Sequence, residues 1–223
     1  GYSWLKQEKV RLHTVPRWQR LIRLRVGRAM NALQYLSTTR EWRYQTPWYL
    51  LCGETASGKS AIINSLVNGH NYQQSRQEKR LKSAGDGWHF FERAMVIDAD
   101  KAIASTQHSL SSVTGLKRLG YLLTQLQDFR PERPLDGIVL TVSAQSLLAA
   151  SSPQDYRQLG ESLNRQLWQI QKTTGFVIPV YLLVSQCQQV FGFQRFWQAQ
   201  PPARHEEILG WSNPLRLDAA FDK

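Results

Sequence analysis

Cysteine is scarce in this sequence: only Cys52 and Cys187 occur among 223 residues. They lie in separate apolar runs without the spacing of a disulfide framework, so we expect buried, reduced thiols of a cytosolic domain. No stretch approaches the ~20 consecutive apolar residues that a transmembrane helix needs. The N-terminus also lacks the apolar core and cleavage site of a signal peptide. These absences predict a soluble chain, which is compatible with a piece of a longer protein.

Acidic residues are also scarce, with 17 Asp and Glu against 28 Lys and Arg, which gives a net charge of +11. The excess is concentrated between Lys6 and Arg43, where only Glu8 and Glu41 are acidic. Residues 5–36 place apolar side chains at helical spacing, which predicts one or two amphipathic helices interrupted near Pro16. We therefore expect residues 1–46 to form a basic helical arm that attracts an anionic partner. Lipid headgroups and nucleic acid are equally compatible with the arm itself.

The rest of the chain, residues 47–223, alternates short apolar runs with helical patterns. Apolar residues make up 42% of the sequence, which argues against disorder. We expect a mobile loop over 69–87 and a tight turn at Glu92 and Arg93. Strands alternating with helices indicate an α/β fold, a mostly parallel sheet with helices on both faces. The expected strands are 48–52, 89–91, 94–98, 137–142 and 177–184, and the expected helices are 59–67, 113–128 and 153–173.

One segment carries a phosphate-binding pattern, G-x-x-x-x-G-K-[ST], between an expected strand and an expected helix. Its residues are Gly53, Glu54, Thr55, Ala56, Ser57, Gly58, Lys59 and Ser60. Glycines allow such a loop to wrap around a phosphate with its amides pointing inward, and the helix that follows adds its N-terminal dipole. Lys59 would neutralise phosphate charge and the Ser60 hydroxyl would bind Mg²⁺. The pattern predicts a P-loop NTPase-like three-layer sandwich that binds ATP or GTP with Mg²⁺.

A second candidate for the site is Asp98, at the end of the expected strand 94–98. An acid in this place holds Mg²⁺ in P-loop proteins, so we assign Asp98 to the metal and, with Lys59, to any catalysis. Asp100 competes for the same role, and either aspartate could instead cap the next helix. The polar residues that could position an attacking water do not stand out from solvated residues; they are Glu54, Ser57, Gln107 and His108.

The chain resembles the N-terminal cytoplasmic domain of the IcmF/TssM proteins, inner-membrane components of type VI secretion systems and of a related type IV system. The matching segments are 47–60, 88–91 with 94–98, 129–143, and 178–187 followed by Phe191-Gly-Phe. The segment 129–143 is the most specific of these, because an Arg-Pro-Leu-Asp-Gly run that leads into a strand is uncommon.

The resemblance implies a domain placed between transmembrane helices of a much larger protein, at the cytoplasmic face of the bacterial inner membrane. The implied partners are other membrane-complex or baseplate proteins of the secretion system, and nucleic acid is not expected. A basic arm suits that place, because cytoplasmic flanks of membrane spans are rich in Lys and Arg. The implied function is nucleotide binding that regulates assembly or partner docking. A scaffold without nucleotide turnover is the alternative.

Two departures from the family pattern bear on this function. Where the family usually continues Asp-Thr-Ala-Gly, this chain has Asp98-Ala-Asp-Lys101, so the glycine whose amide would sense a γ-phosphate is missing. Where many members have Thr-Lys-Cys-Asp, the chain has Ser185-Gln-Cys-Gln188, so the aspartate that would recognise guanine is replaced by an amide. The choice between ATP and GTP stays open, and we expect slow hydrolysis or binding without turnover.

Overall fold

The computed structural model describes residues 15–37, 39–69, 85–91, 93–103, 109–206 and 209–210. Within these ranges no helix is both long enough and apolar enough to span a bilayer. Several predictions concern residues outside the described ranges: the first part of the basic arm, most of the loop expected at 69–87, and the residues Glu92, Gln107 and His108.

A five-stranded, mostly parallel sheet forms the centre of the molecule, in the order β2-β3-β1-β4-β5. Among the described strands only β2 and β3 pair antiparallel, while β1 pairs parallel with both β3 and β4, and β4 pairs parallel with β5. The predicted α/β class with a mostly parallel sheet is therefore confirmed. The strands are β1 (Trp48–Gly53), β2 (Trp88–Phe90), β3 (Met95–Asp98), β4 (Gly137–Ser143) and β5 (Val180–Ser185).

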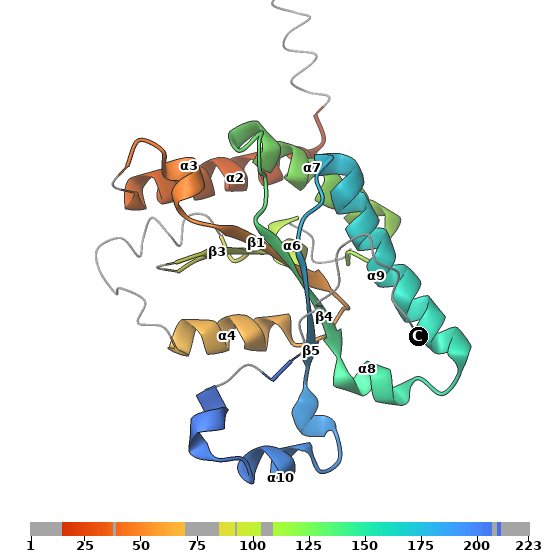
Figure 1. The fold of residues 1–223 in the computed structure, drawn as a ribbon. Coiled ribbons are helices and arrows are strands. Elements are labelled where there is room, and N and C mark those ends of the chain that lie inside the picture. The colour runs from red at the N-terminus through yellow and green to blue at the C-terminus, as the bar shows by residue number, and fades with distance from the viewer. Residues whose placement is uncertain are drawn as a thin grey trace, which may run out of the picture.

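Helices cover the sheet on both faces (Figure 1). A layer of α2 (Arg17–Leu36), α7 (Val113–Phe129) and α9 (Pro153–Thr174) packs on one face, and α4 (Lys59–Gly69) lies on the other. Polar side chains cap the start of two of these helices: Ser112 caps α7, and Ser152 forms a capping box with Asp155 at the start of α9. The shorter elements are α3 (Trp42–Gln45), α6 (Ala99–Ala102), α8 (Ala144–Ala149), η1 (Cys187–Gln189), α10 (Phe193–Gln198) and η2 (Pro202–Glu206).

The described helix of the basic arm, α2, contributes to the same hydrophobic core as the sheet. Ile22 and Val26 are fully buried and Leu33 nearly so, at the helical spacing seen in the sequence. The arginines lie on the solvent side, apart from Arg25, whose Nη1 donates to the Lys101 carbonyl at 2.9 Å. The arm is thus helical and amphipathic where it is described, and the domain boundary at residue 46 stays a prediction.

The two faces of the sheet are buried to different extents. Side chains on the α2, α7 and α9 face, such as Trp48, Leu50 and Ile97, are fully buried. On the other face Leu51 is buried and Val139 only partly so. Because parallel strands alternate their side chains between faces, the near-continuous apolar runs seen in the sequence correspond to strands covered on both sides.

Strand β5 is the exception to this burial. It lies at the edge of the sheet, paired with β4 alone among the described strands. Its five apolar side chains are 38% to 63% exposed. An exposed apolar edge strand is unusual in a folded domain.

Helix α9 corrects one detail of the predicted apolar stripe. Tyr156 has the helical spacing of the apolar positions Leu163, Leu167 and Ile170, which predicts a core position, but it is exposed. The first turns of α9 lie beside α8 (Figure 1). The Tyr156 hydroxyl donates to the Leu147 carbonyl of α8 at 3.1 Å. Gln166 is instead fully buried on the same helix, and Leu163 and Leu167 are partly buried against the core.

Arg130 and Asp136 link the starts of β1 and β4, at the end of these strands opposite to the glycine-rich segment. We call this contact the arginine clamp. Arg130 is fully buried and its guanidinium stacks 4.5 Å from the Trp48 ring centroid and 4.7 Å from that of Tyr44. Its Nη1 donates to Asp136 Oδ2 at 2.8 Å, and the same oxygen accepts from the Trp48 amide at 2.7 Å. Burial lowers the pKa of Arg130, and the hydrogen bond to Asp136 opposes that shift. The Arg-Pro-Leu-Asp-Gly segment is therefore structural.

Replacing Asp136 by Asn tests this clamp, because it keeps the side-chain shape and removes the charge that faces Arg130. We expect the free energy of unfolding to fall by about 3 kcal/mol, since a buried guanidinium is left without its counter-charge. Urea denaturation measures the change. The same substitution at the exposed Asp128 is the control, with an expected effect within about 0.5 kcal/mol. Equal losses at both positions would contradict the clamp.

The two cysteines, both expected to be buried, differ in their exposure to solvent. Cys52, in the middle of the sheet, is fully buried, and desolvation raises the pKa of its thiol to about 12. Cys187 is only partly buried, so the prediction of a buried thiol was wrong there. The physical reason is its place in η1, which follows the exposed edge strand rather than a covered one. Both thiols are free.

A thiol-reactive probe should therefore modify one cysteine in the folded protein, because only a thiolate reacts and Cys52 stays protonated and enclosed. We expect one equivalent to react under native conditions and a second only in denaturant, measured by absorbance of the released chromophore. In the Cys187→Ser variant no thiol should react until the protein unfolds. Rapid modification of both cysteines in native buffer would show that the strand around Cys52 opens readily.

Candidate functional site

The glycine-rich loop, residues 53–60, connects the carboxyl end of β1 to the first turn of α4, as its sequence predicts. Gly53 has a φ of +130°, and a Cβ there would lie 2.2 Å from the Thr141 carbonyl oxygen of β4. Only glycine fits this close approach. Gly58 has a φ of +73°, and Ala56 has a φ of +63° that non-glycine residues rarely adopt. The loop is thus held in a tightly curved, partly strained conformation.

The carbonyl groups of the loop accept hydrogen bonds from side chains of the loop itself and from side chains at the end of β5. The Glu54 carbonyl accepts from Ser57 Oγ at 2.8 Å and from Lys59 Nζ at 2.5 Å. Gln186 Nε2 donates to the Ala56 carbonyl at 3.0 Å, and Ser185 Oγ donates to the Ser57 carbonyl at 2.6 Å. The amides of Gly53, Glu54 and Ser57 also donate hydrogen bonds within the protein. The donors that remain for a ligand are the other amides of the loop and those of the first turn of α4.

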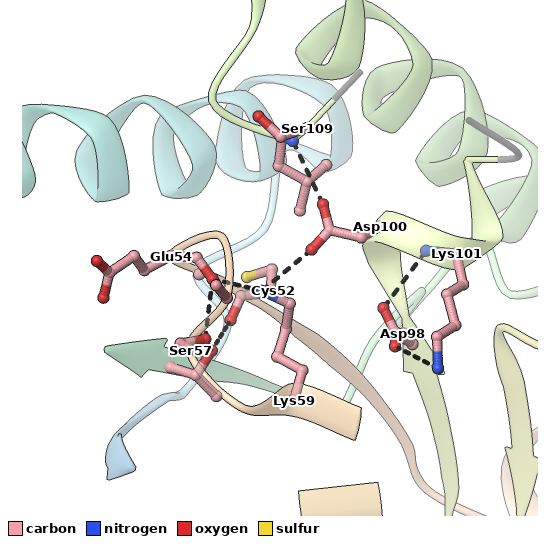
Figure 2. A network of polar contacts seen from close by, with 12 residues as sticks. Cys52, Glu54, Ser57, Lys59, Asp98, Asp100, Lys101 and Ser109 are labelled. Atoms are coloured by element: carbon pink, nitrogen blue, oxygen red, sulfur yellow. Dashed lines mark hydrogen bonds and ion pairs between the residues drawn. The ribbon is translucent and has the colours of Figure 1, made fainter. Parts of the chain in front are cut away.

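Lys59 lies folded back over this loop. Its side chain is 8% exposed, and its ammonium group also pairs with Asp100 Oδ2 at 3.1 Å (Figure 2). A nearly buried ammonium at the start of a helix, beside a curved loop, is a strong anion-binding arrangement. In this structure its charge is balanced by an aspartate of α6.

Each of the two candidate metal-binding aspartates forms an ion pair with a lysine. Asp98, 2% exposed at the end of β3, caps α6: its Oδ1 accepts from the Lys101 amide at 3.4 Å, and its Oδ2 lies 3.6 Å from Lys101 Nζ. The capping role considered from the sequence is thus present. Asp100 also accepts from the Leu110 amide at 3.3 Å. No group of three or more His, Cys, Asp or Glu that could hold a metal is found in the part of the chain that the structure describes.

The other polar residues of the loop divide into two groups. The Glu54 carboxylate accepts from the Ser143 amide at 2.9 Å and from the Ser146 hydroxyl. The buried Ser57 hydroxyl lies 2.6 Å from that of Thr141. Thr55 and Ser60 are exposed, and the remaining candidates for positioning water, Gln107 and His108, lie outside the described residues.

Gln166 is a positioning residue that the sequence analysis did not identify. From α9 its Oε1 accepts from the Gly53 amide at 3.0 Å, and its Nε2 donates to the Gly53 carbonyl at 3.1 Å. This fully buried amide therefore supports both polar groups of the first loop residue. The available signal was a polar residue at helical spacing within the apolar stripe, three positions after Leu163 and four before Ile170.

The segment Ser185-Gln186 is a second loop support, although its sequence was considered for base recognition. Gln186 adopts a left-handed φ of +57° at the end of β5. It bridges two elements, because Ser143 Oγ donates to its Oε1 at 2.9 Å while its Nε2 holds the loop carbonyl of Ala56. Gln188, at the position expected to contact the base, is exposed.

Comparison with known proteins agrees with the sequence resemblance. Residues 117–223 match the model of the IcmF-related N-terminal domain. The type VI secretion system component TssM1 of Pseudomonas aeruginosa is 26% identical over 182 residues, which cover 78% of this chain and 16% of that protein. The chain therefore spans about a sixth of the length of this relative.

Among solved structures, that of sup35 complexed with GDP is 11% identical and covers 68% of this chain and 41% of that one, with a TM-score of 0.25. A TM-score this low does not indicate a shared fold. The family model covers the chain from within α7 onward, and the TssM1 similarity extends over most of the chain. Together these two similarities support membership of the IcmF/TssM family.

Proposed function

We propose that the glycine-rich loop binds the phosphate groups of ATP or GTP, within a P-loop NTPase-like domain. The observation that carries the proposal is the nearly buried Lys59 ammonium, which lies over a curved loop whose carbonyls already accept hydrogen bonds from side chains. The loop amides and α4 supply donors for phosphate oxygens, and Lys59 supplies the charge. Glycine at 53 and the amide of Gln166 keep the loop in this shape.

Magnesium is the metal that accompanies such a nucleotide, and the candidate ligands suit it chemically. The Ser60 hydroxyl and the Asp98 carboxylate are hard oxygen donors of the kind Mg²⁺ prefers. When bound, Mg²⁺ neutralises charge on the phosphate oxygens. Of these two residues, Asp98 is engaged by Lys101 in the structure, so its carboxylate has to exchange partners before it holds a metal.

Turnover is proposed to be slow or absent. Both loop residues considered for positioning water are engaged: Glu54 by Ser143 and Ser146, and Ser57 by Thr141. A carboxylate bonded to a helix N-terminus is not free to orient a water molecule. We therefore infer binding as the main activity, with Lys59 and Asp98 as the residues for any residual hydrolysis.

The cellular role that we propose is supported by the similarity to TssM1. Type VI secretion is named for the TssM1 relative, and we propose that this domain works at the cytoplasmic face of an inner-membrane secretion complex. Nucleotide binding there would bias assembly or the docking of other membrane-complex or baseplate proteins, through ordering of segments near the phosphates. The segments that we expect to respond, 69–87 and 99–112, lie partly outside the described residues. A scaffold with a vestigial loop is the competing outcome.

Calorimetric titration of ATP and of GTP, each with Mg²⁺, into the protein and its Lys59→Ala variant tests the proposal. We expect a micromolar dissociation constant, about −8 kcal/mol, that is lost in the variant because the phosphate charge is no longer neutralised. Lys117→Ala, on the exposed side of α7, is the matched control and should bind like the parent. Absence of binding by the parent, with folding verified by circular dichroism, would favour the scaffold.

The support from α9 gives a second prediction. Gln166→Leu removes both hydrogen bonds to Gly53 while keeping a side chain of similar volume, so the loop loses its fixed conformation. We expect nucleotide affinity to fall about tenfold, or 1.4 kcal/mol, together with a stability loss of about 1–3 kcal/mol from the unpaired Gly53 groups. Gln158→Leu, exposed on the same helix, should change neither. Unchanged affinity in a destabilised Gln166 variant would limit Gln166 to a structural role.

A further inference from the structure

The short helix α6 brings two consecutive residues of opposite charge to the glycine-rich loop. It begins directly after β3, the neighbour of β1 in the sheet, so its first turn lies beside the loop. Asp100 contacts Lys59 of the loop, and Lys101 contacts Asp98 at the end of β3 (Figure 2). We call these two contacts the α6 ion pairs.

Asp100 places a carboxylate against the ammonium that would neutralise a phosphate. The distance of 3.1 Å from Asp100 Oδ2 to Lys59 Nζ is that of a direct ion pair. Lys59 is 8% exposed and Asp100 29% exposed, so the pair is shielded from much of the solvent. A carboxylate in this place competes with a phosphate for the same ammonium and repels its charge.

Lys101 places an ammonium against the carboxylate that is the candidate ligand for Mg²⁺. Its Nζ lies 3.6 Å from Asp98 Oδ2, and its backbone amide donates to Asp98 Oδ1. Asp98 is 2% exposed, whereas Lys101 is 40% exposed and can swing away into solvent. A cation already at the carboxylate lowers the affinity of the site for a second, divalent cation.

We propose that Asp100 and Lys101 are internal substitutes for the phosphate and the metal, which inhibit ligand binding at the glycine-rich loop until α6 releases them. This inference rests on the proposed nucleotide-binding function and names its regulation. Each charge of the site is matched inside the protein, so the ligand-free site is stable, and a nucleotide must displace Asp100 from Lys59 before it binds. A factor that moves α6 would raise the affinity of the loop.

A different role for Asp100 predicts the opposite result. If Asp100 served to orient Lys59 toward phosphate, removing its carboxylate would weaken binding. If Asp100 competes with phosphate, the same change strengthens binding, because Lys59 becomes available and the repulsion disappears. The sign of the change in affinity therefore decides between the two.

The experiment measures binding of ATP, GTP and inorganic pyrophosphate by calorimetry to the parent protein and to Asp100→Ala. Pyrophosphate reports on the loop without any contribution from the base. We expect about tenfold tighter binding by the variant. Asp100→Asn, which keeps the side-chain volume, serves if the alanine variant folds poorly, and Asp128→Asn is the exposed control. Equal or weaker binding by the Asp100 variants overturns the proposal.

The metal half is tested by comparing ATP binding with Mg²⁺ and with EDTA. In the parent, Mg²⁺ should change the affinity little, whereas in Lys101→Gln it should raise the affinity at least fivefold, because Asp98 is free to hold the ion. An equal Mg²⁺ effect in both proteins overturns the role of Lys101.

If the Asp100→Ala variant binds nucleotide and the parent does not, both the inhibition by Asp100 and the binding site at the loop are supported. Absence of binding by parent and all variants overturns the nucleotide site itself, which distinguishes the two failures.

Discussion

The close parallel approach of β1 and β4 is the constraint on which the site depends. Their register brings Gly53 opposite Thr141, so near that a side chain at 53 would collide with the β4 backbone. The chain leaves the sheet at this point with a positive φ and turns into the loop. The Thr141 hydroxyl then donates to the Cys52 carbonyl and lies beside Ser57. The shape of the loop is therefore fixed by β4 as much as by its own glycines.

The two ends of this strand pair have different tasks. At the amino end, the Arg130–Asp136 clamp ties the starts of β1 and β4 together through an enclosed ion pair and aromatic stacking. At the carboxyl end, the polar groups of the loop are held by Gln186, which follows β5, and by Gln166 of α9. The most specific sequence match to the family lies at the structural end. The clamp supports the fold, whereas the carboxyl end of the strands carries the proposed binding site.

Much of the fold was predictable from local patterns. The apolar runs of β1 and β4 and the helical spacing in α2 and α7 are strong signals, because each element buries a continuous face. The glycine-rich loop was predictable from spacing because its glycines meet steric demands. The edge position of β5 was not, since an apolar strand has the same composition whether or not another layer covers it.

The supports of the site were less accessible to sequence analysis. Gln166 and Gln186 act through contacts across more than a hundred residues of sequence, and a single glutamine has no local pattern that marks such a role. The ion pair between Lys59 and Asp100 likewise joins residues that the sheet order brings together. Local rules identified Asp98 but not the lysine that meets it, because pairing depends on the turn of α6.

Whether the loop amides contact phosphate is the central question, and nuclear magnetic resonance tests it most directly. Backbone amide signals of residues 55–60 would be followed while ATP is added to the labelled protein. The proposed site predicts saturable shifts that are largest at these amides and absent in Lys59→Ala. Shifts spread over the basic face of α2, or none at all, would contradict phosphate binding by the loop and leave the domain a scaffold.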